Sequence, residues 1–344
     1  MKQQVPELLW TQPAWLEQAA AWIRAELDRQ GIRVLGPIEQ PHIRPWSTVL
    51  RAPTSDGDVY FKAVPSLLKH EVAITEALAR WRPDCIPHIR AADSDRGWMI
   101  MSDSGTRLRD IIRPNQDIRP WFSVLPLYAK LQIEMSSQVD ALLALGAPDR
   151  RLAVLPRLYV ELLTDREILR IDQTPGLTSE EYARLNDLTP RLAAICGELA
   201  KHSIPESLHH GDLHDGNIFF QHERYIFFDW GDCSITHPFF SFRTVMASNE
   251  NSLGLAEDAP EHEQLRDIYL EPWAGLQLRE NLLAAFKLAQ QVWMIPTALT
   301  WHRILANSDA TARETYAEPV PALLQEFLTA QVPPKANETR GIRA

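Results

Sequence analysis

The sequence has 344 residues, of which 45% are hydrophobic and 23% are charged. These proportions are ordinary for a folded globular chain, and they exclude collagen, coiled-coil arrays and wholesale disorder. The formal net charge of -10 disfavours non-specific binding to nucleic-acid phosphates. Three widely spaced cysteines, Cys85, Cys196 and Cys233, give no sign of a disulfide framework.

Targeting and membrane signals are absent from the sequence pattern. The first twelve residues contain no long apolar run, and charge or proline interrupts every longer apolar stretch. We therefore expect a cytoplasmic protein, a monomer or a homodimer, with neither a membrane nor nucleic acid as a partner.

The first hundred residues predict one helix followed by a strand-rich region. Apolar residues at helical spacing predict a helix within residues 13–30. The β-branched and proline-rich stretch that follows predicts three strands, near 33–40, 46–52 and 59–64. Ser55-Asp56-Gly57-Asp58 is a strong turn signal between the last two. A helix at 67–81 and two strands around Asp95-Arg96-Gly97 complete this region.

From about Arg107 the sequence is mostly helical. Apolar periodicity predicts helices at 121–145, 155–163, 179–200, 241–249, 261–269 and 279–304. We divide the chain into an N-terminal helix (1–31), a β-rich lobe (32–105), a helical lobe (106–332) and a polar tail (333–344). The expected fold class is therefore α+β, with a small β-rich N-lobe and a larger, mostly helical C-lobe.

The densest group of polar residues lies between 208 and 230. Two apolar runs around Gln221-His222-Glu223-Arg224 predict a β-hairpin. Because a hairpin returns its last residue beside its first, Asn217 and Asp229 meet at one end, with Asp212 in the loop just before. Two hard-oxygen ligands beside a further carboxylate predict a Mg²⁺ site next to a general base.

A second pair of charged residues is predicted in the β-rich lobe. Lys62 lies within the apolar strand Tyr60-Phe61-Lys62-Ala63-Val64. In the next helix, Glu71 falls on the same stripe as the apolar residues Leu67, Ile74, Leu78 and Trp81. A buried glutamate needs a cation partner, because an unpaired buried charge is costly. Lys62 is the natural candidate.

These residues resemble a known family in order and spacing. His210-Gly211-Asp212, Asn217 and Phe228-Asp229-Trp230 are similar to the catalytic loop and hairpin of the aminoglycoside phosphotransferase and choline kinase group. Members of that group are relatives of protein kinases, so the resemblance implies a protein-kinase-like two-lobed fold. It also implies that Asp212 orients the substrate hydroxyl and accepts its proton, and that Asn217 and Asp229 hold Mg²⁺. His210 would brace the loop.

The same resemblance implies a nucleotide site in the β-rich lobe. Lys62, held by Glu71, would contact the nucleotide phosphates, and the hinge from Met101 to Asp103 would meet the adenine edge. The chain has no glycine-rich loop between its first strands. Pro45-Trp46-Ser47-Thr48 occupies that turn, and Ser47 and Thr48 are expected to donate to phosphate. Ser241 stands where the group usually has a supporting aspartate.

The expected function is transfer of a phosphoryl group from ATP, or GTP, with Mg²⁺, to a hydroxyl of a small molecule. The sequence leaves the acceptor open among amino sugars, amino alcohols, sugars and homoserine-like alcohols. An acidic stretch suggests the hypothesis of a cationic acceptor, against the reading of a solvated helix face. Its members are Glu250, Glu257, Asp258, Glu261, Glu263 and Asp267.

Two other classes of function remain open from the residues. A metal-dependent hydrolase would bind Zn²⁺ or a metal pair through side chains of the same loop and hairpin. Those side chains are His209, His210, Asp212, His214 and Asp229. A non-catalytic kinase-like binding module is the other, although such a module would be expected to lack the base or a metal ligand.

Overall fold

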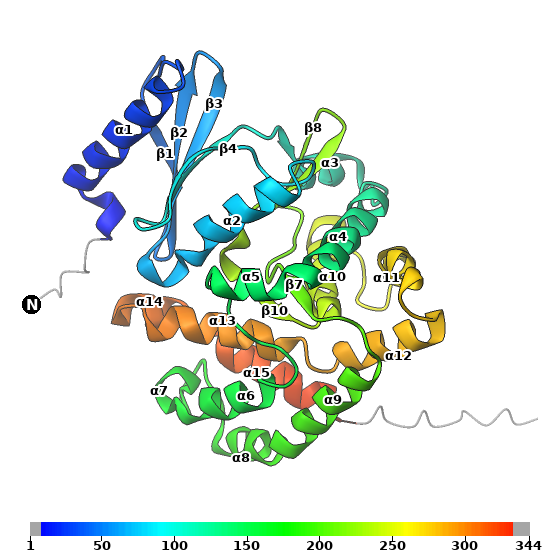
Figure 1. Ribbon diagram of the computed structural model, residues 1–344. Coiled ribbons are helices and arrows are strands. Elements are labelled where there is room, and N and C mark those ends of the chain that lie inside the picture. The colour runs from blue at the N-terminus through cyan, green and yellow to red at the C-terminus, as the bar shows by residue number, and fades with distance from the viewer. Residues whose placement is uncertain (1–7, 333–344) are drawn as a thin grey trace, which may run out of the picture.

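The computed structural model describes residues 8–332, which form a small sheet-containing lobe and a larger helical lobe (Figure 1). The small lobe contains α1 (Pro13–Asp28), β1 (Glu39–Arg44), β2 (Ser47–Thr54), β3 (Gly57–Ala63), α2 (His70–Trp81), β4 (Ile89–Asp93) and β5 (Trp98–Ser102). The expected polar tail, 333–344, and the first seven residues lie outside the described residues.

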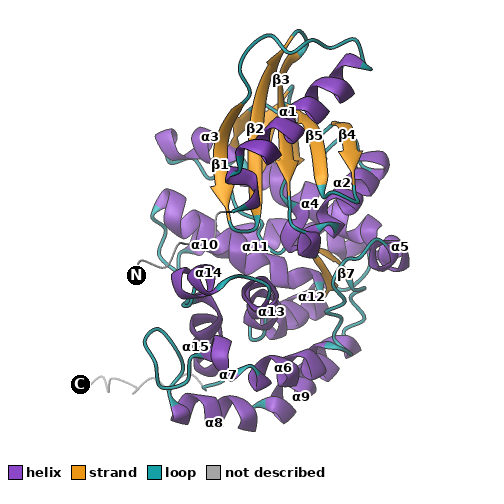
Figure 2. Ribbon diagram, turned by 90° about the vertical axis from the view of Figure 1, so that its left-hand side faces the viewer, coloured by secondary structure: helices purple, strands orange, loops and turns teal. Residues whose placement is uncertain are grey.

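The small lobe is built on one antiparallel sheet with the order β1-β2-β3-β5-β4. Helix α1 lies across one face of this sheet (Figure 2). Its buried residues share a hydrophobic cluster with sheet residues such as Leu50, Phe61 and Ile100. The N-terminal helix is therefore part of the small lobe's core and not a separate unit.

The alternation of side chains along β2 decides which residues reach the other face of the sheet. Leu50 and Ala52 are buried against α1, while Val49 and Arg51 between them are only partly buried. Successive strand residues point to opposite faces, so odd-numbered β2 positions face away from α1. The sheet thus has one apolar face that forms a core and one face that lines a cleft.

The larger lobe is mainly helical and contains two small sheets. Its strands are β6 (Thr106–Arg107), β7 (Ser207–His209), β8 (Ile218–Gln221), β9 (Arg224–Phe227) and β10 (Ser234–Thr236). Its helices are α3 (Leu108–Asn115), α4 (Trp121–Met135), α5 (Val139–Ala144), α6 (Leu155–Thr164), α7 (Arg166–Leu169), α8 (Ser179–Asp187), α9 (Thr189–Lys201), α10 (Phe242–Leu253), α11 (Pro260–Leu270), α12 (Arg279–Ala289), α13 (Met294–Ala306), α14 (Ala310–Thr315) and α15 (Pro319–Ala330). One hydrophobic cluster unites most of them.

Several sequence-based boundaries need correction. The first strand was expected at 33–40, but β1 begins at Glu39 and extends to Arg44. Three predicted helices are each divided in two: 121–145 into α4 and α5, 179–200 into α8 and α9, and 279–304 into α12 and α13. The sequence pattern also missed α3, α7, α14 and α15.

No single helix within residues 8–332 has the length and apolar character needed to cross a membrane. Only α12 and α13 taken together meet those criteria, and they bend by 43° at the break between them.

Candidate active site

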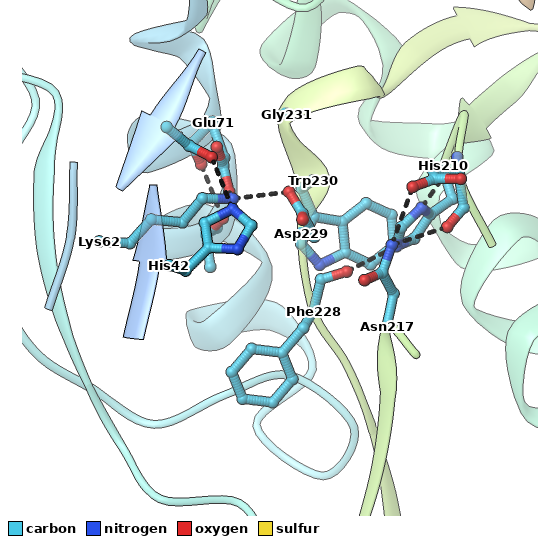
Figure 3. A network of polar contacts seen from close by, with 12 residues as sticks. His42, Lys62, Glu71, His210, Asn217, Phe228, Asp229, Trp230 and Gly231 are labelled. Carbon is cyan, nitrogen blue, oxygen red and sulfur yellow. Dashed lines mark hydrogen bonds and ion pairs between the residues drawn. The ribbon is translucent and has the colours of Figure 1, made fainter. Parts of the chain in front are cut away.

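The hairpin predicted from the sequence is β8–β9. Ile218 pairs with Phe227, and the Phe228 N–H donates to the Asn217 carbonyl at 2.8 Å. Asn217 and Asp229 consequently lie at the same end of the hairpin, as expected (Figure 3). Asp229 has φ +65°, a left-handed conformation that costs a non-glycine residue energy and is often found at functional sites.

The loop before β8 holds the Asp212 carboxylate by one of its two oxygens. The Asn217 amide Nδ2 donates to Asp212 Oδ2 at 3.2 Å and to the Asp212 carbonyl at 2.9 Å. His214 Nδ1 accepts from the Gly216 N–H at 2.8 Å, so its proton is on Nε2, 3.3 Å from Asp212 Oδ2. Asp212 Oδ1 has no hydrogen-bond partner within the described residues and is free to accept a proton.

His210 and Gly211, at the start of this loop, fix its conformation. His210 Nε2–H donates to the Phe228 carbonyl at 2.7 Å, and its Nδ1 accepts from the Asp212 N–H at 3.3 Å. The His210 ring also lies against Trp230, with 4.5 Å between ring centroids. Gly211 has φ +85°, and a Cβ there would lie 2.2 Å from the Asp232 carbonyl oxygen, so only glycine fits.

Lys62 links the two lobes at the centre of the site. Its Nζ lies 2.5 Å from Glu71 Oε1 and 2.6 Å from Asp229 Oδ1 (Figure 3). The predicted Lys62–Glu71 pair is therefore present. Burial lowers the pKa of Lys62, but the charges of Asp229 and Glu71 raise that pKa by more, so the ammonium stays charged.

The residues present suit a Mg²⁺ ion bound together with nucleotide phosphates. Asn217 donates through Nδ2, which leaves its Oδ1 as an acceptor, and Asp229 uses only Oδ1 on Lys62. The Asp229 side chain is 50% exposed, whereas that of Lys62 is 9% exposed. Two oxygen ligands without a complete protein cage match the way Mg²⁺ keeps water and phosphate oxygens as ligands.

The arrangement does not match the zinc hydrolase alternative. No three His, Cys, Asp or Glu side chains within residues 8–332 converge as a metal cage. His209 Nδ1 is 2.7 Å from the Ser241 hydroxyl, and His210 is engaged with the Phe228 carbonyl. The histidines of the loop therefore point to separate structural partners.

The hinge residues lie beside the same cleft, although not all of their backbone groups are free. Met101 and Asp103 both line the cleft, which has a volume of about 970 Å³. The Asp103 N–H donates to the Asp58 carbonyl at 3.1 Å. The Asp103 carbonyl and the Ser104 N–H make no hydrogen bond within the part of the chain described, and both residues line the cleft. Adenine contact at this hinge stays a prediction.

Of the two phosphate donors expected at the β1–β2 turn, only Ser47 reaches the cleft. Ser47 lines it, whereas Thr48 is fully buried and its hydroxyl donates to the His42 carbonyl at 2.8 Å. Consecutive strand residues point to opposite faces of a sheet, so both could not have faced the nucleotide. The expectation for Thr48 is therefore wrong.

The acidic stretch in 250–267 does not line the cleft either. None of its six carboxylates is among the cleft-lining residues, and three of them pair with arginines. Glu250 lies 2.8 Å from Arg243, and Asp267 lies 2.7 Å from Arg279. Glu263 lies 3.7 Å from Arg266. The stretch therefore lies outside the cleft that contains Lys62 and Asp229, while Glu263 and Asp267 line a separate pocket beside α11. The hypothesis that it attracts a cationic acceptor stays a prediction.

Sequence reasoning missed several residues that position the loop. Asp215 is fully buried, paired with Arg109 at 2.8 Å and hydrogen-bonded by Ser252. Tyr128 Oη accepts from the His210 N–H at 3.1 Å and lies 2.8 Å from the Ser241 hydroxyl. Ser241 thus supports the loop at the position where the related enzymes usually carry aspartate. The second aspartate in Asp212-Leu213-His214-Asp215 was the available signal for Asp215.

Another missed carboxylate is Asp232, which lines the cleft beside Gly211. Burial, together with the charges of Asp212 and Asp229, raises the pKa of Asp232 to about 7. The carboxylates of Asp212, Asp229 and Asp232 therefore lie close together in the cleft, and their combined negative charge favours a cation there.

A comparison with protein-family models tests the resemblance that was inferred from the sequence. Residues 134–280 match the model of the phosphotransferase enzyme family. This segment contains the whole catalytic loop and the β8–β9 hairpin, so the resemblance to the aminoglycoside phosphotransferase and choline kinase group is confirmed. No curated protein sequence matches the chain.

Solved structures show the same fold over nearly the whole chain. The ethanolamine kinase of Plasmodium vivax has a TM-score of 0.63 at 11% identity, covering 94% of this chain and 89% of its own. The choline kinase of Cryptosporidium parvum has a TM-score of 0.60 at 13% identity, covering 92% and 95%. A macrolide 2'-phosphotransferase of Brachybacterium faecium has a TM-score of 0.54 at 18% identity, covering 87% and 97%. The expected two-lobed, protein-kinase-like α+β fold is confirmed.

Proposed function

We propose that this protein transfers the γ-phosphoryl group of ATP, bound with Mg²⁺, to a hydroxyl group of a small molecule. The family match over the catalytic segment supports a small-molecule phosphotransferase. The observation that carries the proposal is Asp212, whose Oδ2 is held by Asn217 and His214 while its Oδ1 is free.

The chain's own groups, together with Mg²⁺, would position the two reactants. Lys62, fixed by Glu71, places a permanent positive charge where the α- and β-phosphates of a nucleotide would lie. Asn217 Oδ1 and Asp229 Oδ2 would hold Mg²⁺, which when bound neutralises charge on the phosphates. Catalysis of this kind depends on orientation and charge neutralisation more than on covalent chemistry.

Asp212 acts on the acceptor side. Its free Oδ1 would accept a hydrogen bond from the acceptor hydroxyl and direct that oxygen at the γ-phosphorus. It would take the hydroxyl proton as the new O–P bond forms and the bridging P–O bond to the β-phosphate breaks, which releases ADP. The two donors on Oδ2 stop the carboxylate from rotating away from this position. General-base assistance of this type contributes about 10²–10⁴-fold to a rate.

The test is a screen of alcohols with nucleotide consumption as the readout. The panel contains amino sugars, amino alcohols, neutral sugars and homoserine-like alcohols, each with ATP or GTP and Mg²⁺. We expect one class to stimulate consumption in the native protein and not in Asp212→Asn. Consumption that no alcohol stimulates, or that survives in Asp212→Asn, would overturn the proposal.

A further inference from the structure

The turn between β1 and β2 is too short to hold phosphates with its backbone. In kinases with a glycine-rich loop, the loop covers the nucleotide phosphates, and backbone N–H groups in such loops bind anions. Here Arg44 pairs directly with Ser47, so Pro45 and Trp46 alone form the turn. Proline has no N–H to donate. Trp46 is then the only residue of this two-residue turn with a backbone N–H, so the other phosphate donors on this side of the cleft must be side chains.

His42 is placed to be such a donor. It pairs with Val49, which pairs with Lys62, which in turn pairs with Met99. Residues directly opposite one another in an antiparallel sheet share a face, and all four of these line the cleft. In Figure 3 the His42 ring lies beside Lys62 on the side of Asp229.

The chemistry around His42 suits an anionic ligand. Arg44 lies two residues further along β1, hence on the same face, and forms no ion pair within residues 8–332. Arg107 and Lys62 also face this part of the cleft, with Asp229 the one carboxylate among the charged groups near His42. The cations gathered around His42 would attract the negative charge of a phosphate group at this end of the cleft.

His42 would act as a neutral hydrogen-bond donor. Burial, followed by the charges of Arg44 and Lys62, lowers the pKa of His42, while Asp229 raises it by less. Its Nε2 is 3.5 Å from the Ser47 hydroxyl, at the edge of hydrogen-bonding distance. That long contact leaves the ring free to turn toward a ligand.

We propose that the His42 and Arg44 side chains bind the nucleotide phosphates, in place of the backbone groups of a glycine-rich loop. This inference rests on the proposed function, because it requires a nucleotide in the cleft. It also makes β1, an edge strand, part of the binding site.

The experiment compares ligands that differ only in their phosphates. Affinities of the full-length protein for ATP, ADP and adenosine are measured by titration calorimetry for the native chain, His42→Ala and His42→Gln. We expect His42→Ala to weaken ATP binding by about 10- to 100-fold, as for loss of a hydrogen bond to a charged group. Adenosine affinity should stay within about 2-fold, and His42→Gln, which retains a donor, should recover most of the loss.

Two further variants serve as control and second test. Ile43→Ala alters the neighbouring β1 residue, which points to the opposite face, and should change none of the three affinities. Arg44→Gln changes an exposed side chain and should weaken ATP binding but not adenosine binding, even if His42→Ala fails to fold.

The outcomes separate this inference from the proposed function. A native chain that binds neither ATP nor GTP overturns the proposed function and the inference together. A native chain that binds ATP, with His42→Ala and Arg44→Gln binding it equally well, overturns the inference alone. An equal loss of ATP and adenosine affinity shows a purely structural role for β1 and also overturns it.

Discussion

His214 and Asn217 both donate to the same oxygen of Asp212, and this asymmetry defines which oxygen can act as the base. His214 does so only because the Gly216 N–H occupies its Nδ1 and fixes the proton on Nε2. Burial lowers the pKa of His214, but the hydrogen bond and charge of Asp212 raise that pKa by more. The histidine is therefore a positioning residue for Asp212.

Substitutions at His214 should distinguish the roles of its two ring nitrogens. His214→Asn keeps an acceptor near the Nδ1 position but loses the Nε2 donor, so we expect kcat to fall by about 10- to 100-fold through misorientation of Asp212. His214→Gln keeps a donor near Nε2 and should recover part of kcat. Steady-state kinetics with saturating ATP provide the measurement. Equal kcat values in the native chain and His214→Asn would contradict the positioning role.

Asn217→Ala and Asp229→Ala should each raise the Mg²⁺ concentration that gives half-maximal activity. We expect the larger effect from Asp229→Ala, because it removes the only charged ligand of the pair. Activity is titrated with Mg²⁺ at fixed ATP for both variants. Two titration curves that coincide with the native curve would place the metal elsewhere.

The sequence predicted most of the candidate site because the informative residues are close together along the chain. Asp212, Asn217 and Asp229 lie within one loop and hairpin, so their spacing fixes their geometry. Thr48 was misassigned because the position of the strand was known only approximately, and a one-residue difference changes the face. His42 was missed for the same reason, since the first strand was expected to end at 40.

At the level of elements, α13 holds the small lobe at two points. Trp46 in the β1–β2 turn packs against Tyr316 and against Trp301 of α13, with ring centroids 4.7 Å and 5.6 Å apart. Arg303 of α13 donates to the Leu67 carbonyl just before α2 at 2.5 Å. These contacts connect the β1–β2 turn and the segment before α2 to the helical lobe.

Loss of the Trp46 contacts should weaken the attachment of the small lobe to the helical lobe beside the cleft. We expect Trp46→Ala to speed nucleotide release several-fold and to lower the free energy of unfolding by roughly 1–3 kcal/mol, through two lost aromatic pairs and part of the buried area. Release of a fluorescent nucleotide is followed by stopped flow. Trp22→Ala is the matched control, because Trp22 packs on Phe61 and Trp98 on the α1 side of the sheet. Equal release rates in both variants would contradict the interlobe role.

The errors in the predicted helices and strands also have local causes in the sequence. β1 has the sequence Glu-Gln-Pro-His-Ile-Arg and lies at a sheet edge, so it lacks the apolar alternation by which strands are recognised. The break between α8 and α9 lies just before Pro190, which starts α9 in its first turn. That proline was a readable signal, whereas α15 begins with two prolines that obscure its periodicity.

At the level of the whole molecule, buried neutral histidines link stability to pH. Burial lowers the pKa of both His209 and His237 to about 3, with nearby Arg150 and His202 adding to the respective shifts. Both groups bind a proton more readily in the unfolded chain, whose histidine pKa is near 6.5. Their contribution to stability is therefore present above pH 6.5 and is lost as pH falls toward 3.

We expect the free energy of unfolding to drop by roughly 2 kcal/mol per histidine between pH 7 and pH 5. Denaturant titrations across this range provide the measurement. His237→Asn keeps an acceptor for the Phe239 N–H but cannot titrate, so its stability should depend less steeply on pH. An equally steep dependence in this variant would show that other groups cause the acid sensitivity.

The central claim is that Asp212 directs phosphoryl transfer from a nucleotide to a small-molecule hydroxyl. Phosphorus NMR of a reaction with ATP, Mg²⁺ and the best acceptor from the screen tests it most directly, because a phosphomonoester and inorganic phosphate give separate signals. We predict a phosphomonoester signal with the native chain. With Asp212→Asn, which should still bind ATP, formation of that signal should be slower by about 10²–10⁴-fold. Release of inorganic phosphate alone, or a phosphomonoester formed equally fast by Asp212→Asn, would contradict the account.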